Sequence, residues 1–194
     1  MNPMSVVQTE NARLKDENTQ LRQEVSNLRE FVRILDELST RASRVKDDAE
    51  VLPLLDMILR HALDLLDAPE GTLALLDEKT HELVFVIVQG ALSAQLTGYR
   101  ISANEGIAGW VMQNAAPALV RDVRRDTRFF ADIDEKFKFR TLSIAAAPLI
   151  GNGKVLGLIE VLNQPGDEPF SESDMALLKL MCRFAGEALA ELEQ

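Results

Sequence analysis

Apolar residues recur at every seventh position near the N-terminus, which is the spacing of a coiled-coil seam. One series comprises Val7, Leu14, Leu21, Leu28 and Leu35, and the series three residues earlier comprises Met4, Asn11, Asn18, Val25 and Val32. Valine in the earlier series with leucine in the later one favours two strands. The residues predicted to hold two chains together are Asn11, Leu14, Asn18, Leu21, Val25, Leu28, Val32 and Leu35.

Charged residues flank this seam with matching signs. Glutamates stand on one side, at Glu10, Glu17 and Glu24, and basic residues five positions later, at Lys15, Arg22 and Arg29. In a parallel, in-register dimer these positions face each other across the seam, so their agreement in sign favours parallel pairing of identical chains. The two asparagines lower the stability of the seam but fix its register. The alternative is a single solvated helix whose leucine stripe has no partner.

The pattern changes after residue 47 into helical spacing, then into short apolar runs separated by turns. We expect a helix over about 48–66 with Pro53 in its first turn, a hairpin turning at 77–80, and a short strand at 98–102. A short helix through Trp110, a strand at 117–120, a polar connection over 121–140, a second hairpin around 151–153 and a helix capped by Ser171 and Asp174 follow. This order predicts an α+β domain built on an antiparallel sheet. The predicted boundaries are 1–45 for the coiled-coil helix and 46–194 for the domain.

Charge and composition restrict the classes of function. The formal net charge of the chain is -10. Residues 1–46 carry a net charge of about +1, so the remaining residues carry about -11 and the domain is strongly acidic. An acidic domain argues against nucleic-acid binding, which depends on lysine and arginine neutralising phosphates. No apolar run approaches the ~18 residues of a membrane-spanning helix, and the single cysteine excludes an internal disulfide. We expect a cytoplasmic protein that contacts neither membrane nor nucleic acid.

The stretch "NEGIAGWVMQNAAPALVRDVRRDTRFF" resembles the middle of a GAF domain, with Asp122, Val123, Asp126, Arg128 and Phe129 at the family's motif positions. The stretch "APLIGNGKVLGLIEVLNQPGDEPFSESDMALL" is similar to the family's last hairpin and closing helix. The resemblance covers about residues 48–192. It implies a six-stranded antiparallel sheet with helices on both faces and a small-molecule pocket on the face opposite the terminal helices.

Within that family, cyclic-nucleotide-binding members carry an Asn-Lys pair followed by a Phe-x-x-x-Asp-Glu motif. This chain matches it in part, at Asn163, Phe170 and Asp174, but Gln164 replaces the lysine and Met175 replaces the glutamate. The ion pair that the motif implies cannot form here. The resemblance therefore leaves cyclic nucleotide binding open without favouring it, and no cofactor is expected.

Candidate ligand-binding residues come from the polar connection and from the second hairpin. Seven of the thirteen basic residues after residue 46 lie in 121–140. An arginine there, such as Arg124 or Arg125, could hold a phosphate or carboxylate; alternatively these charges pair with neighbouring aspartates. Glu160 interrupts an apolar strand and either faces the pocket or pairs with a loop arginine. The remaining candidates are Trp110, Phe129 and Phe137, which are otherwise plain core, and Thr141 and Ser143.

Enzyme chemistry has little support in the sequence. His61 and His81 have no ligand-spaced partners, so no metal site is expected, and Cys182 lies on a helix stripe as a small hydrophobe. We therefore expect a non-enzymatic, homodimeric sensor that binds a small ligand and signals to a downstream protein. The alternatives are a scaffold that binds no ligand, and the N-terminal regulatory part of a larger signalling enzyme.

Overall fold

The computed structural model describes residues 48–167 and 169–192, together with positions 10, 11, 13–15, 17–19, 21, 22, 25, 29, 32–34, 36–38 and 40. The chain divides into two compact units, residues 1–39 and 40–194. Each unit is described by itself below. In the part of the chain described, no helix is long and apolar enough to cross a membrane.

Every described position between 10 and 40 is helical. Within this helix Arg13 pairs with Glu10 at 2.7 Å, and Arg33 pairs with Glu37 at 3.7 Å. Four seam residues, Leu14, Leu21, Val25 and Val32, are 45–62% exposed, and Asn11 and Asn18 are exposed as well. Leu28 and Leu35 lie outside the described residues. The helical state agrees with the heptad pattern, and its pairing with a second chain stays a prediction.

The second unit is an α+β domain, as the sequence predicts. The chain runs through α2 (Asp48–Leu65), β1 (Glu70–Asp77), β2 (Glu82–Gln89), α3 (Ser93–Leu96), β3 (Arg100–Ser102), α4 (Gly106–Asn114) and β4 (Ala118–Val120). After a 3-10 turn at Val123–Arg125 it continues through α5 (Asp132–Phe137), β5 (Ile144–Gly151), β6 (Lys154–Leu162), a second 3-10 turn at Pro165–Asp167 and α6 (Glu172–Leu192). The strands form one antiparallel sheet in the order β3-β2-β1-β6-β5-β4.

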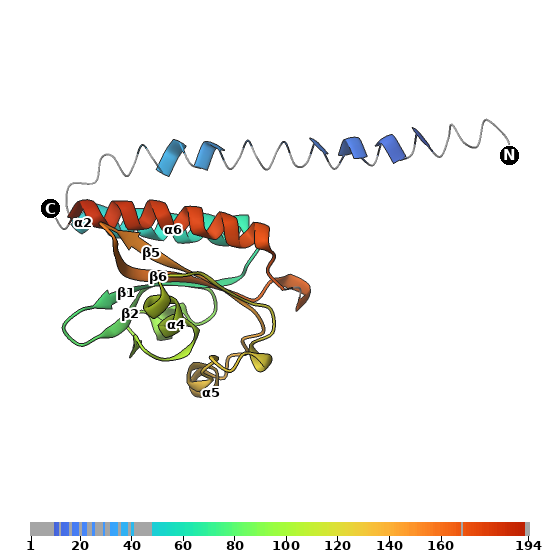
Figure 1. Ribbon diagram of the computed structural model, residues 1–194. Helices are drawn as coiled ribbons and strands as arrows, with labels where there is room; N and C mark the ends of the chain where they lie inside the picture. The colour runs from blue at the N-terminus through green and yellow to red at the C-terminus, as the bar shows by residue number, and fades with distance from the viewer. Residues whose placement is uncertain are drawn as a thin grey trace. The chain divides into compact units, whose positions relative to one another are not determined.

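Helices lie on both faces of this sheet (Figure 1). Helices α2 and α6 pack side by side on one face, with α6 along β5, while α4 and α5 lie on the other face. Helical spacing explains the first layer, because α2 buries Leu55, Ile58, Leu59 and Ala62 against the sheet. The strands β5 and β6 are apolar on both sides because both of their faces are covered.

Two details of the helices bear on the sequence predictions. The capping box of α6 is confirmed, because Ser171 N–H donates to Asp174 Oδ2 at 2.7 Å and Asp174 N–H donates to Ser171 Oγ at 3.2 Å. The placement of Pro53 in the first turn of α2 is wrong: the helix begins at Asp48, so Pro53 is its sixth residue. Its ring is exposed, and burial of the next turns against the sheet compensates for the lost hydrogen bond.

A close backbone contact joins α6 to β5. At Gly186 an added Cβ would overlap the carbonyl oxygen of Ile150, and at Gly151 it would lie 2.5 Å from the carbonyl oxygen of Gly186. The two glycines therefore let the helix lie directly on the strand.

We predict that Gly186→Ala lowers the free energy of unfolding by about 1–3 kcal/mol, because the methyl group must push α6 off β5. Helix propensity alone predicts the opposite sign, a gain of about 1 kcal/mol. The neighbouring substitution Glu187→Ala, at an exposed site, is the control and should change stability by less than about 0.5 kcal/mol. Urea denaturation followed by circular dichroism measures both; a Gly186→Ala variant as stable as the parent would contradict the close contact.

Candidate ligand-binding cavity

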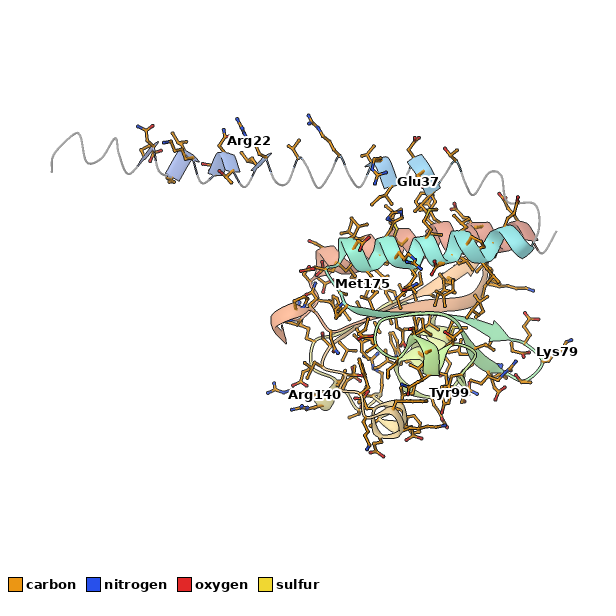
Figure 2. All side chains as sticks on the ribbon, turned by 180° about the vertical axis from the view of Figure 1, so that it is seen from behind. Arg22, Glu37, Lys79, Tyr99, Arg140 and Met175 are labelled. Carbon is orange, nitrogen blue, oxygen red and sulfur yellow. The ribbon has the colours of Figure 1, made fainter. Side chains whose placement is uncertain are left out.

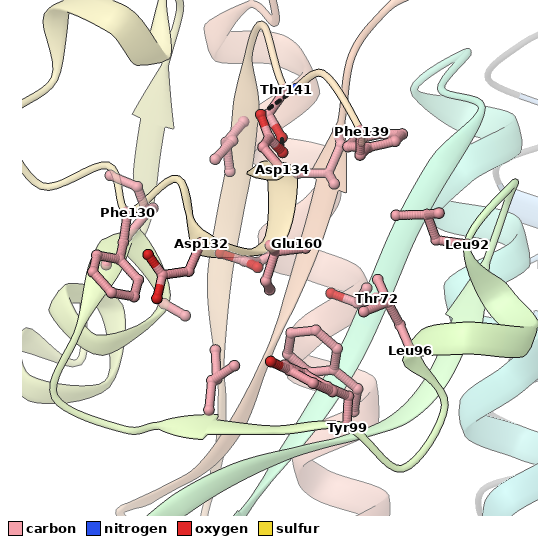
Figure 3. Close-up of a pocket in the computed structure, with 18 of the residues that line it drawn as sticks. Thr72, Leu92, Leu96, Tyr99, Phe130, Asp132, Asp134, Phe139, Thr141 and Glu160 are labelled. Atoms are coloured by element: carbon pink, nitrogen blue, oxygen red, sulfur yellow. Dashed lines mark hydrogen bonds between the residues drawn. The ribbon is translucent and has the colours of Figure 1, made fainter. Parts of the chain in front are cut away.

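A cavity of about 310 Å³ opens on the sheet face opposite α2 and α6. Its floor is formed by β1, β2, β5 and β6, and its walls by α3, the segment 99–102, the start of α4, and residues 129–134 leading into α5. Figure 3 shows side chains from these elements converging on one space. The position of the cavity agrees with the pocket that the sequence resemblance implies.

A row of cross-strand neighbours crosses the cavity floor. Thr72 on β1 pairs with Glu160 on β6, and Glu160 pairs on its other side with Ala146 on β5. Directly opposed residues of antiparallel strands point to the same sheet face. Thr72 and Glu160 both line the cavity, and both project into it from the floor. The sheet register therefore places a hydroxyl and a carboxyl group side by side in its centre.

Glu160 is half-buried in the cavity floor. Its neighbours on the same face of β6 are Leu158, which is buried, and Leu162. Among the described residues its carboxylate has no hydrogen-bond or ion-pair partner. Burial therefore raises the pKa of Glu160 to about 7, because water is partly withdrawn and nothing replaces it. Of the two alternatives from the sequence, the structure shows Glu160 facing the cavity and not pairing with a loop arginine.

Thr72 is also buried without a side-chain partner. It is 5% exposed, and its hydroxyl group makes no hydrogen bond with the described residues. Its oxygen is not sealed off, because no fully buried side-chain oxygen or nitrogen of the described residues lacks a partner, so the hydroxyl group is open to the cavity. Thr72 and Glu160 thus form a polar pair at the centre of the floor.

Aromatic rings form much of the wall. Phe85 and Tyr99 pack with their ring centroids 6.3 Å apart, and Phe129, Phe130 and Phe139 complete the aromatic lining. Tyr99 also meets Phe137 edge to face at 5.5 Å, and the ammonium group of Lys136 stands over the Tyr99 ring at 4.7 Å. Figure 2 shows Tyr99 on the side of the sheet away from α2 and α6.

Two side chains fix the segment that bounds the cavity near α5. Asp134 accepts hydrogen bonds from the Thr141 hydroxyl at 2.7 Å and from the Thr141 amide at 2.8 Å (Figure 3). Asn163 accepts from the Leu142 amide at 2.7 Å and donates to the Arg140 carbonyl at 3.0 Å. These bonds hold the return of the chain from α5 into β5 beside the cavity.

The structure brings some of the predicted site residues together and separates others. Phe129, Thr141 and Glu160 line the cavity. Trp110 instead lies under the guanidinium group of Arg128 at 4.4 Å, and Phe137 packs on Tyr99. Ser143, immediately before β5, is 3% exposed and does not line the cavity.

The predicted loop arginines do not line the cavity either. Arg125 pairs with Asp122 at 3.3 Å and is 88% exposed, while Arg124 is exposed at the surface. Arg128 pairs with Asp126 at 2.6 Å. The alternative that these charges pair with nearby aspartates therefore describes Arg125 and Arg128.

Each residue of the partial nucleotide motif has a structural role. Asn163, which adopts a positive φ of 55°, holds the 140–142 backbone as described above. Phe170 is 1% exposed in the core, and Asp174 caps α6. None of the three lines the cavity.

Sequence reasoning missed several cavity residues. Thr72 carried a signal, because it is a polar residue in the run "TLALL" at a position that strand periodicity places on one face with Ala74. Tyr99 and Phe130 carried none, because irregular segments bring them to the cavity, and Asp132 and Asp134 carried none, because they lie in the short helix α5, whose direction no strand periodicity defines.

Cys182 has the environment that the sequence suggested. It is 1% exposed, and its Sγ donates to the carbonyl oxygen of Ala147 at 3.4 Å. Burial raises the pKa of its thiol, which keeps the group protonated and unreactive. Among the described residues no cluster of histidine, cysteine, aspartate and glutamate is arranged to hold a metal ion.

An antiparallel sheet with two helices on one face and a cavity on the other defines an α+β type of domain. The family model of the GAF domain matches residues 50–189. The chain belongs to the GAF domain family, whose members are sensory domains.

Curated relatives are much longer than this chain. It is 28% identical over 169 residues to the dual 3',5'-cyclic-AMP and -GMP phosphodiesterase 11 of Drosophila melanogaster, covering 78% of this chain and 12% of that protein. It is 26% identical over 141 residues to the probable 3',5'-cyclic phosphodiesterase pde-5 of Caenorhabditis elegans, covering 68% of this chain and 19% of that protein. The match thus concerns a small part of each relative.

Solved structures share the fold at low sequence identity. The GAF domain of a phosphoenolpyruvate-protein phosphotransferase from Coxiella burnetii superposes with a TM-score of 0.71 at 18% identity, covering 84% of this chain and 94% of that one. The corresponding domain from Acinetobacter gives 0.69 at 22% identity, covering 86% and 94%. These likenesses establish the fold.

We predict that Glu160→Gln stabilises the domain more at high pH than at low pH. The carboxyl pKa is raised in the folded state from 4.5 to about 7, so the folded chain holds an extra proton between these values, and the stability of the parent falls as pH rises through this window. Glutamine stays neutral, so the variant should gain up to about 3 kcal/mol above pH 7 and less toward pH 5.

Urea denaturation at about pH 5.5 and about pH 8.5 measures the difference. Glu187→Gln on α6 is the matched control, because that carboxylate is exposed and paired with Arg183. An equal gain for Glu160→Gln at both pH values would show that Glu160 does not titrate in this window.

Proposed function

We propose that the protein is a non-enzymatic, cytoplasmic sensor in which the GAF domain binds a small ligand and a parallel coiled coil aligns two copies. The observation that carries the proposal is the cavity of about 310 Å³ with an unpartnered carboxyl group in its floor. Ligand sites in proteins are concave and mainly apolar, with a few well-placed polar groups. The cavity fits that description.

The strand β6 offers a path from the cavity to the opposite face. Glu160 faces the cavity, while its neighbours Ile159 and Val161 point to the face covered by the helices and are fully buried. A ligand that favours one position of β6 would therefore favour one packing of α6 on the sheet. A ligand can change the state of the protein only by such a difference in affinity.

The N-terminal helix supports the dimer part of the proposal. Its seam residues Leu14, Leu21, Val25 and Val32 are exposed in the single chain. An apolar stripe of this kind is normally covered by a partner, and a second copy satisfies both the stripe and the flanking charges. The output then passes to a downstream signalling protein through the relative pose of the two copies.

A second candidate is that the chain is the regulatory part of a larger signalling enzyme. The relatives named phosphodiesterases favour it, since this chain matches only 12% and 19% of their lengths. Cyclic nucleotides are not favoured as the ligand, because Arg124 and Arg125 lie outside the cavity lining. A scaffold without a ligand is the outcome that remains if the ligand test fails.

We predict that a small-molecule library or fractionated cell extract contains compounds that raise the melting temperature. At a hundredfold excess over Kd the rise should be roughly 5–10 °C. Leu162→Trp, which fills the cavity from its floor, should abolish the shift, and Leu52→Trp at an exposed site of α2 should keep it. Absence of any shift that depends on Leu162 would favour the scaffold.

We predict that Asn11→Val with Asn18→Val raises the stability of the coiled coil but yields more than one oligomeric species, because the asparagines restrict register. Asn27→Val, at a position that the heptad places outside the seam, is the control and should leave one species. Analytical ultracentrifugation measures both. Deletion of residues 1–45 should weaken the dimer at least tenfold; an unchanged dimer would place the main interface in the GAF domain.

A further inference from the structure

We propose that the ligand of this cavity is a compact, mainly apolar molecule with a positively charged amine, which binds to Glu160 and Thr72 at the centre of the sheet. The inference rests on the proposed function, because it names the chemistry of the ligand that the sensor detects. It follows from three independent properties of the cavity: its polar pair, its other charges and its rings.

The polar pair needs a partner that donates hydrogen bonds to the carboxylate. Glu160 can only accept when ionised, and Thr72 both donates and accepts. Among the described residues neither side chain has a hydrogen-bond partner, although Thr72 is 95% buried and both face into the cavity. Glu160 is half-buried, and no fully buried side-chain oxygen or nitrogen of the described residues lacks a partner, so both polar groups are open to the cavity and to a molecule within it. A primary ammonium group has three donors and can bond both side chains.

The other charges of the lining have the sign that attracts a cation. The lining holds one basic residue, Arg100, and several acidic ones. The acidic residues are Glu70, Glu105, Asp132, Asp134 and Glu160. The guanidinium group of Arg100 bonds Asp77 and Glu82, each at 2.9 Å, so it is already neutralised at the sheet edge. A ligand anion would therefore meet carboxylates with no arginine or lysine of the lining left to pair with it.

The aromatic walls are compatible with both parts of such a ligand. Phe85, Tyr99, Phe129 and Phe139 offer apolar contact to a hydrocarbon or ring. Ring faces also attract cations. Lys136 already shows this at the Tyr99 ring, where its ammonium group lies 4.7 Å from the centroid and 3.2 Å from the hydroxyl oxygen.

The volume restricts the size of the ligand. A cavity of about 310 Å³ lies at the lower end of the range of about 300–1,000 Å³ typical of small-molecule sites. A molecule with one aromatic ring system or a short chain, and one amine, fits that size.

Binding of a cation should also depend on pH. An ammonium group beside Glu160 favours the ionised carboxylate, so binding should strengthen as pH rises through about 7, the raised pKa of Glu160. Below that pH the carboxyl group is protonated in the free protein, and binding of the amine releases this proton. The charged groups around Glu160 are Glu70 from β1, Arg100 from β3, Glu105 before α4, Asp132 and Asp134 from α5, and Lys136 at Tyr99. Among the described residues, none of these groups pairs with Glu160. The dependence of binding on pH should therefore follow the ionisation of Glu160 itself.

The test uses the full chain and pairs of probes that share a skeleton and differ in charge. Tryptamine is compared with indole-3-propionate, and 2-phenylethylamine with 3-phenylpropionate, and 3',5'-cyclic AMP serves as a further anion. Isothermal titration calorimetry at about pH 8 should give each amine a Kd at least tenfold lower than that of its carboxylate partner.

Variants locate the preference in the cavity. Glu160→Gln should remove the preference for amines, and Thr72→Val should weaken amine binding severalfold without changing its pH dependence. Glu187→Gln, which removes an exposed carboxylate of α6, should leave the preference unchanged.

The outcomes separate this inference from the proposed function. If a carboxylate or cyclic AMP binds at least as tightly as the amines, and Leu162→Trp abolishes that binding, the cavity is a ligand site and only the inference about charge is overturned. Amine binding that survives in Glu160→Gln overturns it as well. If no probe binds and no compound of the wider screen shifts the melting temperature, the inference and the proposed ligand sensor both fail.

Discussion

The pairing of β1 with β6 is the contact on which the sheet and the cavity both depend. It joins two hairpins that are far apart in the sequence, and it places Thr72 directly opposite Glu160. Gly157 makes the close approach possible, because a Cβ there would overlap the carbonyl oxygen of Ala74 on the neighbouring strand. A shift of one residue in this register would turn one of the two polar side chains toward the face that α2 and α6 cover.

The elements of the fold could be predicted because each has a local cause. Two apolar runs around a turn define each hairpin, and the Ser171–Asp174 pair defines the start of α6. Pro53 shows the limit of such rules, since packing of α2 on the sheet determines where the helix begins and the local preference of proline does not override it.

The sequence could predict residues of the cavity only where they lie on strands, because the alternation of side chains along a strand indicates which face each residue occupies. Glu160 was found because one acid in the apolar strand "KVLGLIEVL" needs an explanation. The arginines of 121–140 stand out in the sequence by their charge, but the sequence does not indicate where their side chains point. In the structure two of them pair with aspartates close in sequence: Arg125 with Asp122, and Arg128 with Asp126. Tyr99 enters the cavity from an irregular segment and Asp132 from the short helix α5, so only the three-dimensional structure could place them there.

The free energy of the cavity floor bears on what the domain is for. An ionised carboxyl group between Leu158 and Leu162 destabilises the folded chain, and a leucine at this position would extend the apolar row instead. Polar groups that lose part of their water without gaining a partner lower stability, by up to about 1–3 kcal/mol when they are fully buried; here Glu160 is half-buried and Thr72 is buried at the cavity floor. Folds commonly carry such local conflicts at functional sites, where a bound molecule supplies the missing contacts. Glu160 and Thr72 are placed where a ligand would supply those contacts, and where β6 would connect their occupancy to the helices on the opposite face.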